Sequence, residues 1–219
     1  MRIILIDADG VICEFWQKLL QSRIGGRAKS VDIEVFHGYL DGLDFSVSEE
    51  SVFVSPGNSF GGMGGGYDKA LASLFAEDGN WQNTDRFVRG WISANSRGYS
   101  SPGTAQLIEF SMNRSQAWKK HRSRTLLHLP TMVTPGKLGF TKSQTFTAVF
   151  DWTWQCLIKI HQKKELKVAV FTGMGTGYGQ LDKETVCNAM VSAIFMFAEG
   201  SGAEVPKFLE KTVTGLSSI

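Results

Sequence analysis

Cysteine pairs, signal-like segments and membrane-length apolar runs are all missing from this sequence of 219 residues. The three cysteines, Cys13, Cys156 and Cys187, lie far apart with no paired spacing, which argues against a disulfide framework or a zinc site. No apolar run approaches the ~20 residues that a membrane-spanning helix needs. The acidic residues Asp7 and Asp9 come too early for the apolar core of a secretory signal. We therefore expect a protein of the cytoplasm, or of the cytoplasm and the nucleus, with no membrane partner.

A strong charge of one sign is also lacking. The chain has 23 Lys and Arg against 21 Asp and Glu, a net charge of +2 that is too mild to indicate nucleic acid as a partner. Residues 114–124 form a basic run with one tryptophan, which we expect to be a solvated loop between two strands. The hydrophobic share of 42% is that of an ordinary globular protein, and the length suits one domain over residues 1–219.

Glycine, in contrast, is plentiful and clustered. Of 24 glycines, six fall between Gly57 and Gly66, directly after the β-branched, apolar run 52–54. A helix is expected to follow at 68–75. The order strand, glycine loop, helix places backbone N–H groups and a helix N-terminus around an anion. Glycine also lets a ligand lie against the main chain with no Cβ in the way. The pattern predicts a binding site for a phosphorylated ligand.

Apolar strands alternate with helical patterns along the rest of the chain. Strands are expected at 2–6, 31–36, 52–54, 105–110, 125–129 and 167–171, and further helices at 11–22, 85–95, 141–162 and 182–198. The polar stretch 41–51 is expected to be an exposed connection. This alternation predicts an α/β fold in three layers, α/β/α, with a mixed, mostly parallel central sheet. Because ligands bind beyond the carboxyl ends of such strands, the ends of 52–54, 125–129 and 168–171 should meet at one site.

A second glycine loop, 172–179, follows the last expected strand. Two such loops on adjacent strands would hold a diphosphate from two sides. His128 lies near the carboxyl end of its strand, where Asp68 is also expected. An imidazole and a carboxylate beside a bound phosphate can divide base and acid work, although a histidine in an apolar strand is often a core residue. Which of the two takes which role is left open.

The first loop resembles the macro domain, a module that binds ADP-ribose. The chain is similar to that family at Asn58, at the glycines 64–66 and at Asp68, and differs at Ser55, where most members have asparagine. The amino-acid sequence of the loop, together with segments 127–131 and 175–178, resembles the fungal ADP-ribose-1″-phosphate phosphatases in particular. The resemblance extends from the N-terminus to about Phe197.

This resemblance implies a macro-domain-like fold, a set of site residues and a reaction. The implied catalytic residues are Asn58, Asp68 and His128, with Asn58 positioning the distal ribose. The implied ADP-ribose contacts are Ser55, Gly57, Ser59, Gly64, Gly65, Gly66, Tyr67, Thr172, Gly173, Gly175, Thr176, Gly177 and Tyr178. The implied reaction is hydrolysis of ADP-ribose-1″-phosphate. An ADP-ribosyl hydrolase and a non-catalytic ADP-ribose reader remain as alternatives, and we expect neither a cofactor nor a metal.

Adenine recognition departs from the family pattern. Tyr39 stands where macro domains usually have the aspartate that binds the adenine amine, so Asp7, Asp9, Asp41 or main-chain groups would take over. The segment 6–11 also permits another interpretation, because it resembles the first motif of haloacid dehalogenase-type phosphatases. That interpretation lacks the later acidic pair for magnesium and gives the glycine loop at 57–66 no role.

Overall fold

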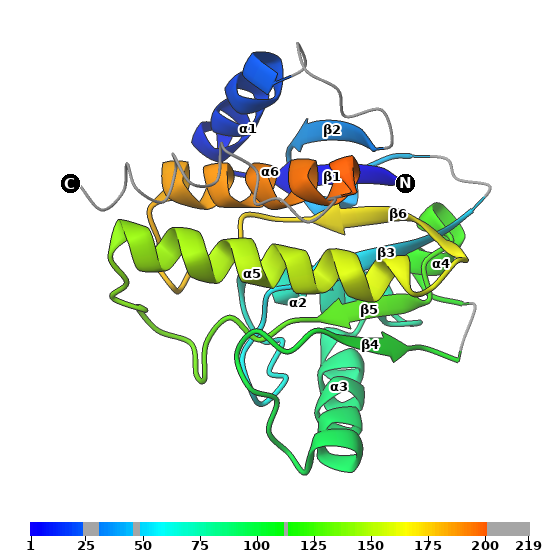
Figure 1. Cartoon of the computed structure of the whole chain (residues 1–219). Coiled ribbons are helices and arrows are strands. Elements are labelled where there is room, and N and C mark those ends of the chain that lie inside the picture. Colours follow the sequence, from blue (N-terminus) through cyan, green and yellow to red (C-terminus); the bar gives the residue numbers. More distant parts are fainter. Residues whose placement is uncertain (24–30, 46–48, 112–113, 201–219) are drawn as a thin grey trace.

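The computed structural model describes residues 1–23, 31–45, 49–111 and 114–200. Its centre is a six-stranded sheet in the order β2-β1-β6-β3-β5-β4 (Figure 1). The strands are β1 (Arg2–Asp7), β2 (Asp32–His37), β3 (Glu50–Ser55), β4 (Gln106–Glu109), β5 (Thr125–His128) and β6 (Leu166–Phe171). All neighbouring strands are parallel except β4, which runs antiparallel to β5. The expected mixed, mostly parallel sheet is confirmed.

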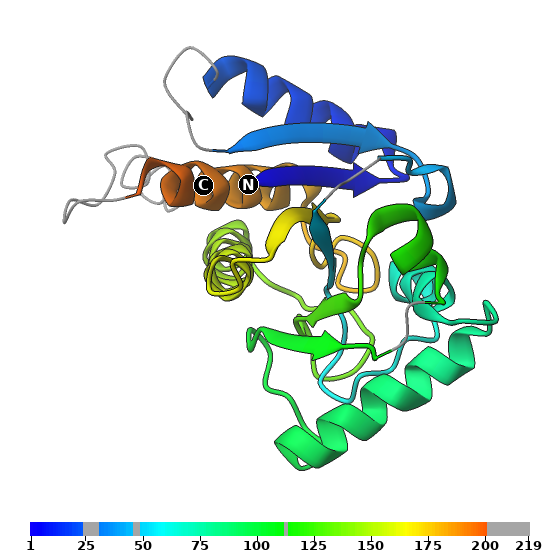
Figure 2. The same cartoon turned by 90° about the vertical axis from the view of Figure 1, so that its right-hand side faces the viewer.

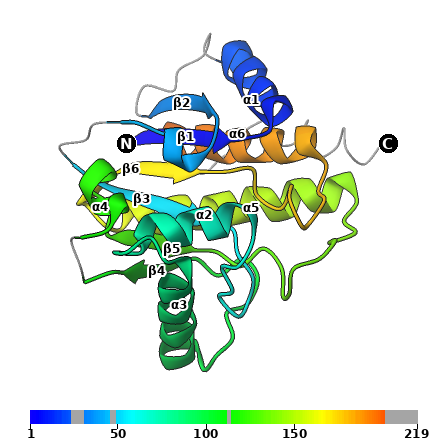
Figure 3. The same cartoon turned by 180° about the vertical axis from the view of Figure 1, so that it is seen from behind.

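Helices cover both faces of the sheet. They are α1 (Gly10–Arg23), the short 3-10 turn η1 (Leu40–Gly42), α2 (Gly66–Phe75), α3 (Trp81–Ser96), α4 (Gln116–His121), α5 (Lys142–His161) and α6 (Lys183–Glu199). Figure 2 looks along the sheet and shows α5 and α6 on one side and α2 and α3 on the other. The view from behind in Figure 3 places α2, α3 and α4 in front of the strands. Among the described residues, no helix is both long and apolar enough to cross a membrane.

Two apolar cores result from the alternation of side chains along each strand. Ile3 and Leu5 of β1 pack into the core under α1, α5 and α6, whereas Ile4 and Ile6 pack into the core under α2, α3 and α4. The other central strands divide in the same way, with successive residues on opposite faces. Strands buried on both faces must be apolar throughout, which is why they read as continuous apolar runs in the sequence.

Two local expectations were wrong. Residues 116–121 form helix α4 where we expected a loop, because Ala117 and His121, four residues apart, both face the core while the lysines between them face solvent. The expected exposed connection at 41–51 buries Leu43 and Phe45, and the ring of Phe45 stacks on His121 at 4.5 Å. Residues 46–48 of that connection lie outside the described residues.

Candidate functional site

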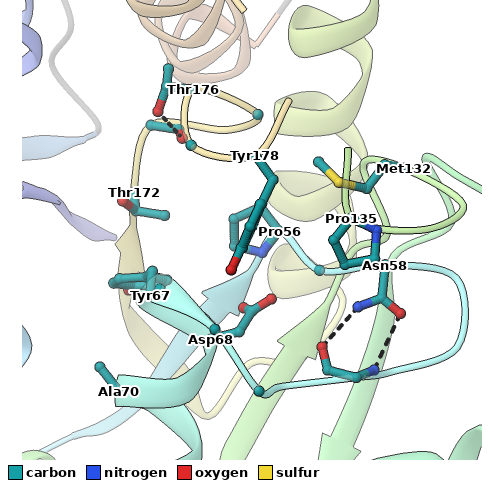
Figure 4. Close-up of a pocket in the computed structure, with 18 of the residues that line it drawn as sticks. Pro56, Asn58, Tyr67, Asp68, Ala70, Met132, Pro135, Thr172, Thr176 and Tyr178 are labelled. Atoms are coloured by element: carbon teal, nitrogen blue, oxygen red, sulfur yellow. Dashed lines mark hydrogen bonds between the residues drawn. The ribbon is translucent and has the colours of Figure 1, made fainter. Parts of the chain in front are cut away.

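The parallel strands bring together loops that are far apart in sequence. Strands β6, β3 and β5 are neighbours in the sheet, so their carboxyl ends meet at one edge, as expected. A cleft of about 1180 Å³ opens there, between the loop after β3 and the loop after β6, and it extends to the ends of β1 and β2. Figure 4 shows Asn58, Met132 and Pro135 on one side of this cleft and Thr172 and Tyr67 on the other. The volume is slightly above the ~300–1,000 Å³ of most small-molecule sites.

The first glycine loop is shaped by the side chain of Asn58. Its Nδ2 donates to the carbonyl of Gly62 (2.8 Å), and its Oδ1 accepts from the main-chain N–H groups of Phe60 and Gly62 (both 3.2 Å). From helix α3, Asp85 accepts the N–H of Met63 at 2.6 Å. The side chain of Asn58 and the helix therefore fix the course of a loop whose glycines alone would leave it free.

Asp68 lies in the first turn of α2 and lines the cleft. Its Oδ1 accepts a hydrogen bond from the hydroxyl of Ser55 at 2.8 Å. Burial raises the pKa of the Asp68 carboxyl to about 6, while the hydrogen bond from Ser55 acts in the opposite direction. A carboxyl group with this pKa is poised to exchange a proton near neutral pH, which is what a general acid or base requires.

His128 lies at the end of β5, beside Ser55 in the register of the sheet. Its side chain is buried and does not line the cleft. A Cβ on Gly57 would lie 2.9 Å from His128 Cε1 and 3.3 Å from Asp68 Oδ2, so both side chains pack against this glycine. Burial lowers the pKa of the His128 ring to about 4, with a smaller raising effect from the main chain of Asn58. The ring is therefore neutral at pH 7.

The second glycine loop is held by Asp7 at the end of β1. Asp7 Oδ2 accepts hydrogen bonds from Thr172 Oγ1 (3.0 Å) and from the N–H of Gly173 (3.2 Å). Where this loop crosses the cleft it meets the first loop, because a Cβ on Gly65 would lie only 2.6 Å from the hydroxyl of Tyr178. Glycine at position 65 lets the two loops touch.

Most of the predicted site residues line one cleft. They are Asp7, Gly57, Asn58, Gly64, Gly65, Gly66, Tyr67, Asp68, Thr172, Gly173, Gly175, Thr176, Gly177 and Tyr178. Ser55, Ser59, His128 and Asp9 are not part of the lining, as far as the structure describes the chain. The hydroxyl of Ser59 donates to the carbonyl of Met132, and Asp9 pairs with Lys183 and accepts the N–H of Val11 at the start of α1. Asp41 also lies outside this lining and accepts the N–H of Gly42.

The sequence did not indicate Arg89 on α3, the segment 134–137 or Leu40 as parts of the lining, whereas Tyr39, the position discussed for adenine recognition, does line it. Arg89 follows Asp85 by four residues, a spacing that places both on one helix face, so the sequence alone could have predicted that they pair. The segment 134–137 has no such periodicity.

The surroundings of Asp7 give this residue a structural role that the haloacid dehalogenase interpretation, in which it would be the nucleophile, does not require. The carboxylate of Asp7 accepts three hydrogen bonds, from Thr172, Gly173 and the main chain of Asp9, and so it holds the second loop in place. Across the described ranges, no group of three or more His, Cys, Asp and Glu side chains is placed to hold a metal ion.

The fold and the site define a class: a three-layer α/β/α domain with two glycine loops around a cleft at the carboxyl edge of its sheet. The model of the macro-like domain family matches residues 1–209, so the chain belongs to this family. An uncharacterised protein of Aquifex aeolicus (strain VF5) is 26% identical over 183 residues, which are 84% of this chain and 88% of that protein.

Solved structures support the fold. The Oceanobacillus iheyensis macrodomain with ADP is similar at a TM-score of 0.54 and 15% identity, over 69% of this chain and 71% of that chain. A mutant of the same macrodomain with ADPR (ADP-ribose) gives a TM-score of 0.53 at 14% identity, over 70% of this chain and 73% of that chain.

Proposed function

We propose that this protein binds ADP-ribose in the cleft and hydrolyses ADP-ribose-1″-phosphate to ADP-ribose and phosphate. The observation that carries the proposal is the position of Asp68, a carboxyl group with a pKa near 6 that lines the cleft between two glycine loops. The structurally similar macrodomain was solved with ADP and with ADPR, which supports the same ligand class here. The loop motifs shared with the fungal phosphatase branch support the reaction.

The ligand would lie along the cleft. Main-chain N–H groups of the two glycine loops would bind the diphosphate. The distal ribose would lie beside Asn58, whose amide shapes the first loop. The base would lie at the opposite end, where Ile6, Asp7 and the segment 38–40 line the cleft. Asp7 is the carboxylate at that end and would provide the adenine contact.

Asp68 would act as the general base. It would take a proton from a water molecule that attacks phosphorus, the bond between phosphorus and the C1″ oxygen would break, and the proton would pass to that sugar oxygen. Water and the phosphate monoester thus become the sugar hydroxyl and inorganic phosphate. His128 would act as a positioning residue, because its neutral ring packs against Gly57, as Asp68 does, and does not line the cleft.

A second candidate is removal of ADP-ribose from a modified macromolecule. Phe60, Tyr99 and Val133 each expose more than a third of their surface, and the rings of Phe60 and Tyr99 meet edge to face at 5.7 Å. Phe60 belongs to the cleft lining, and Val133 lies between the lining residues Met132 and Thr134, so a macromolecule attached to the distal ribose would leave the cleft next to them. Exposed aromatic groups of this kind are common in interfaces.

Parallel assays test the choice. We expect wild-type protein to release phosphate from ADP-ribose-1″-phosphate at a rate that scales with protein concentration, because the cleft would hold both the diphosphate and the base. The same preparation is measured with an ADP-ribosylated protein and, for binding alone, with ADP-ribose. Turnover of only the modified protein would favour the second candidate. Binding of ADP-ribose without turnover of either substrate would indicate a non-catalytic ADP-ribose reader.

A further inference from the structure

The charged side chains of the cleft are separated along its length. Within the described lining, the charged groups are Asp7, Asp68, Arg89 and Lys137. Asp7 lies at the end formed by β1 and β2, and Asp68 lies between the loops. Arg89 lies at the other end, where Arg89 Nη2 and Asn58 Nδ2 both lie close to Gly62, and Lys137 belongs to the segment that runs from Asn58 to the end of the second loop. A carboxylate repels a phosphate dianion at short range unless cations lie close by, so this end is the one suited to a terminal phosphate.

Arg89 is held in a fixed orientation. Its Nε donates to Asp85 Oδ2 at 2.8 Å, while the other oxygen of Asp85 accepts the N–H of Met63. Its Nη2 lies 2.7 Å from the place where a Cβ of Gly62 would be, so glycine at that position lets the guanidinium lie against the first loop. Among the described residues no other partner of this guanidinium is seen, so its remaining N–H groups can form the paired hydrogen bonds that arginine makes with phosphate.

Lys137 belongs to a segment that joins the two glycine loops at this end. The segment starts at Met132, which pairs with Asn58 in an isolated parallel bridge. It ends at Leu138, whose N–H donates to the carbonyl of Gly179 at 3.1 Å. The segment therefore crosses from one loop to the other and closes the cleft, and residues 134–137 line it. Lys137 is exposed and adds a positive charge to this wall of the cleft.

We propose that Arg89 and Lys137 form the subsite for the terminal 1″-phosphate and thereby select the phosphorylated ligand over ADP-ribose itself. The inference rests on the proposed function, since it places the distal ribose beside Asn58. ADP-ribose has no group at this position that needs a cation, so the two side chains contribute little to its binding. The phosphorylated sugar gains charge-assisted hydrogen bonds from both.

The test compares two ligands, ADP-ribose-1″-phosphate and ADP-ribose, on variants in which one of the two cations is replaced by a neutral side chain. For Arg89→Met and for Lys137→Met, we expect the KM for phosphate release from ADP-ribose-1″-phosphate to rise by ~10- to 100-fold, the usual effect of a lost hydrogen bond to a charged group. The Kd of ADP-ribose by calorimetry should stay within about threefold of wild type, which corresponds to less than ~0.7 kcal/mol. Arg86→Met, at an exposed position on α3 outside the lining, and Lys164→Met, beyond the opposite edge of the sheet, are the controls.

Each outcome bears on the proposal in a different way. Equal losses for both ligands would overturn it, because the cations would then bind the diphosphate, and unchanged KM values in both variants would also overturn it. If wild-type protein released no phosphate, calorimetry with ADP-ribose-1″-phosphate would still decide. Tighter binding of that ligand than of ADP-ribose, abolished by the two variants, would uphold the subsite while the proposed hydrolysis failed. If the wild-type protein bound neither ligand, both the subsite and the proposed function would be ruled out.

Discussion

Asp68→Asn is expected to lower the rate of phosphate release from ADP-ribose-1″-phosphate by ~100-fold or more, the usual contribution of a general base. Asparagine keeps the size of the side chain and can still accept the hydrogen bond from Ser55, but it cannot take a proton. The affinity for ADP-ribose should change little, because the proposed diphosphate contacts come from the loops. Steady-state phosphate release and calorimetry measure the two quantities.

The pH profile gives this prediction a second readout. Since the pKa of Asp68 is raised to about 6 and the base must be ionised, kcat/KM of the wild type should rise as pH increases through about 6 and level off above it. Asp151→Asn is the matched control, because burial also raises the pKa of that carboxyl, which lies on α5 outside the cleft lining. Full activity of Asp68→Asn, or an activity that falls as pH rises through 6, would exclude Asp68 as the base.

Acid is expected to destabilise the fold through two buried histidines. Burial lowers the pKa of both His121 and His128 from 6.5 to about 4. A histidine of this kind stabilises the folded state fully above pH 6.5, and that contribution is lost as the pH falls toward 4. The change is up to about 3 kcal/mol for each ring. Asp68, whose pKa is raised, acts in the opposite direction below pH 6 and offsets part of the loss.

His121 allows the acid effect to be isolated. It packs between Phe45 and Phe53, with ring centroids 4.5 Å and 5.5 Å away. His121→Leu should flatten the fall in the free energy of unfolding between pH 7 and pH 4, as measured by urea denaturation, by up to about 3 kcal/mol. The comparison uses the slope with pH, so any constant cost of repacking cancels. His161→Leu, at an exposed position near the end of α5, is the control. An unchanged slope in His121→Leu would contradict the prediction.

The fold and the two glycine loops were predictable because their causes are local. Continuous apolar runs alternating with amphipathic ones require a covered parallel sheet, and such a sheet places the loops after neighbouring strands together. The two glycine loops, 57–66 and 172–179, therefore lie next to each other, as expected. Helix α4 was missed because its basic residues outweighed the spacing of Ala117 and His121, two buried positions that only the packed structure distinguishes from a loop.

The details of the site depend on contacts that the sequence does not contain. His128 is at the carboxyl end of its strand, as predicted, but whether its ring faces the cleft depends on how Gly57 packs against it. Arg89 reaches the first loop because α3 lies against that loop, where Asp85 accepts the N–H of Met63 and Val88 and Ile92 pack against Gly61. Lys137 enters the lining through an irregular segment that the ends of two glycine loops hold in place.

Calorimetry with ADP-ribose and adenosine tests the central claim, namely that backbone amides of the two loops bind the diphosphate. We expect ADP-ribose to bind at one site per chain with a Kd of roughly micromolar order, about −8 kcal/mol. Adenosine, which lacks the diphosphate, should bind at least ~100-fold more weakly, by about 3 kcal/mol. Equal affinities for the two ligands, or no heat with ADP-ribose at millimolar concentration, would contradict the claim.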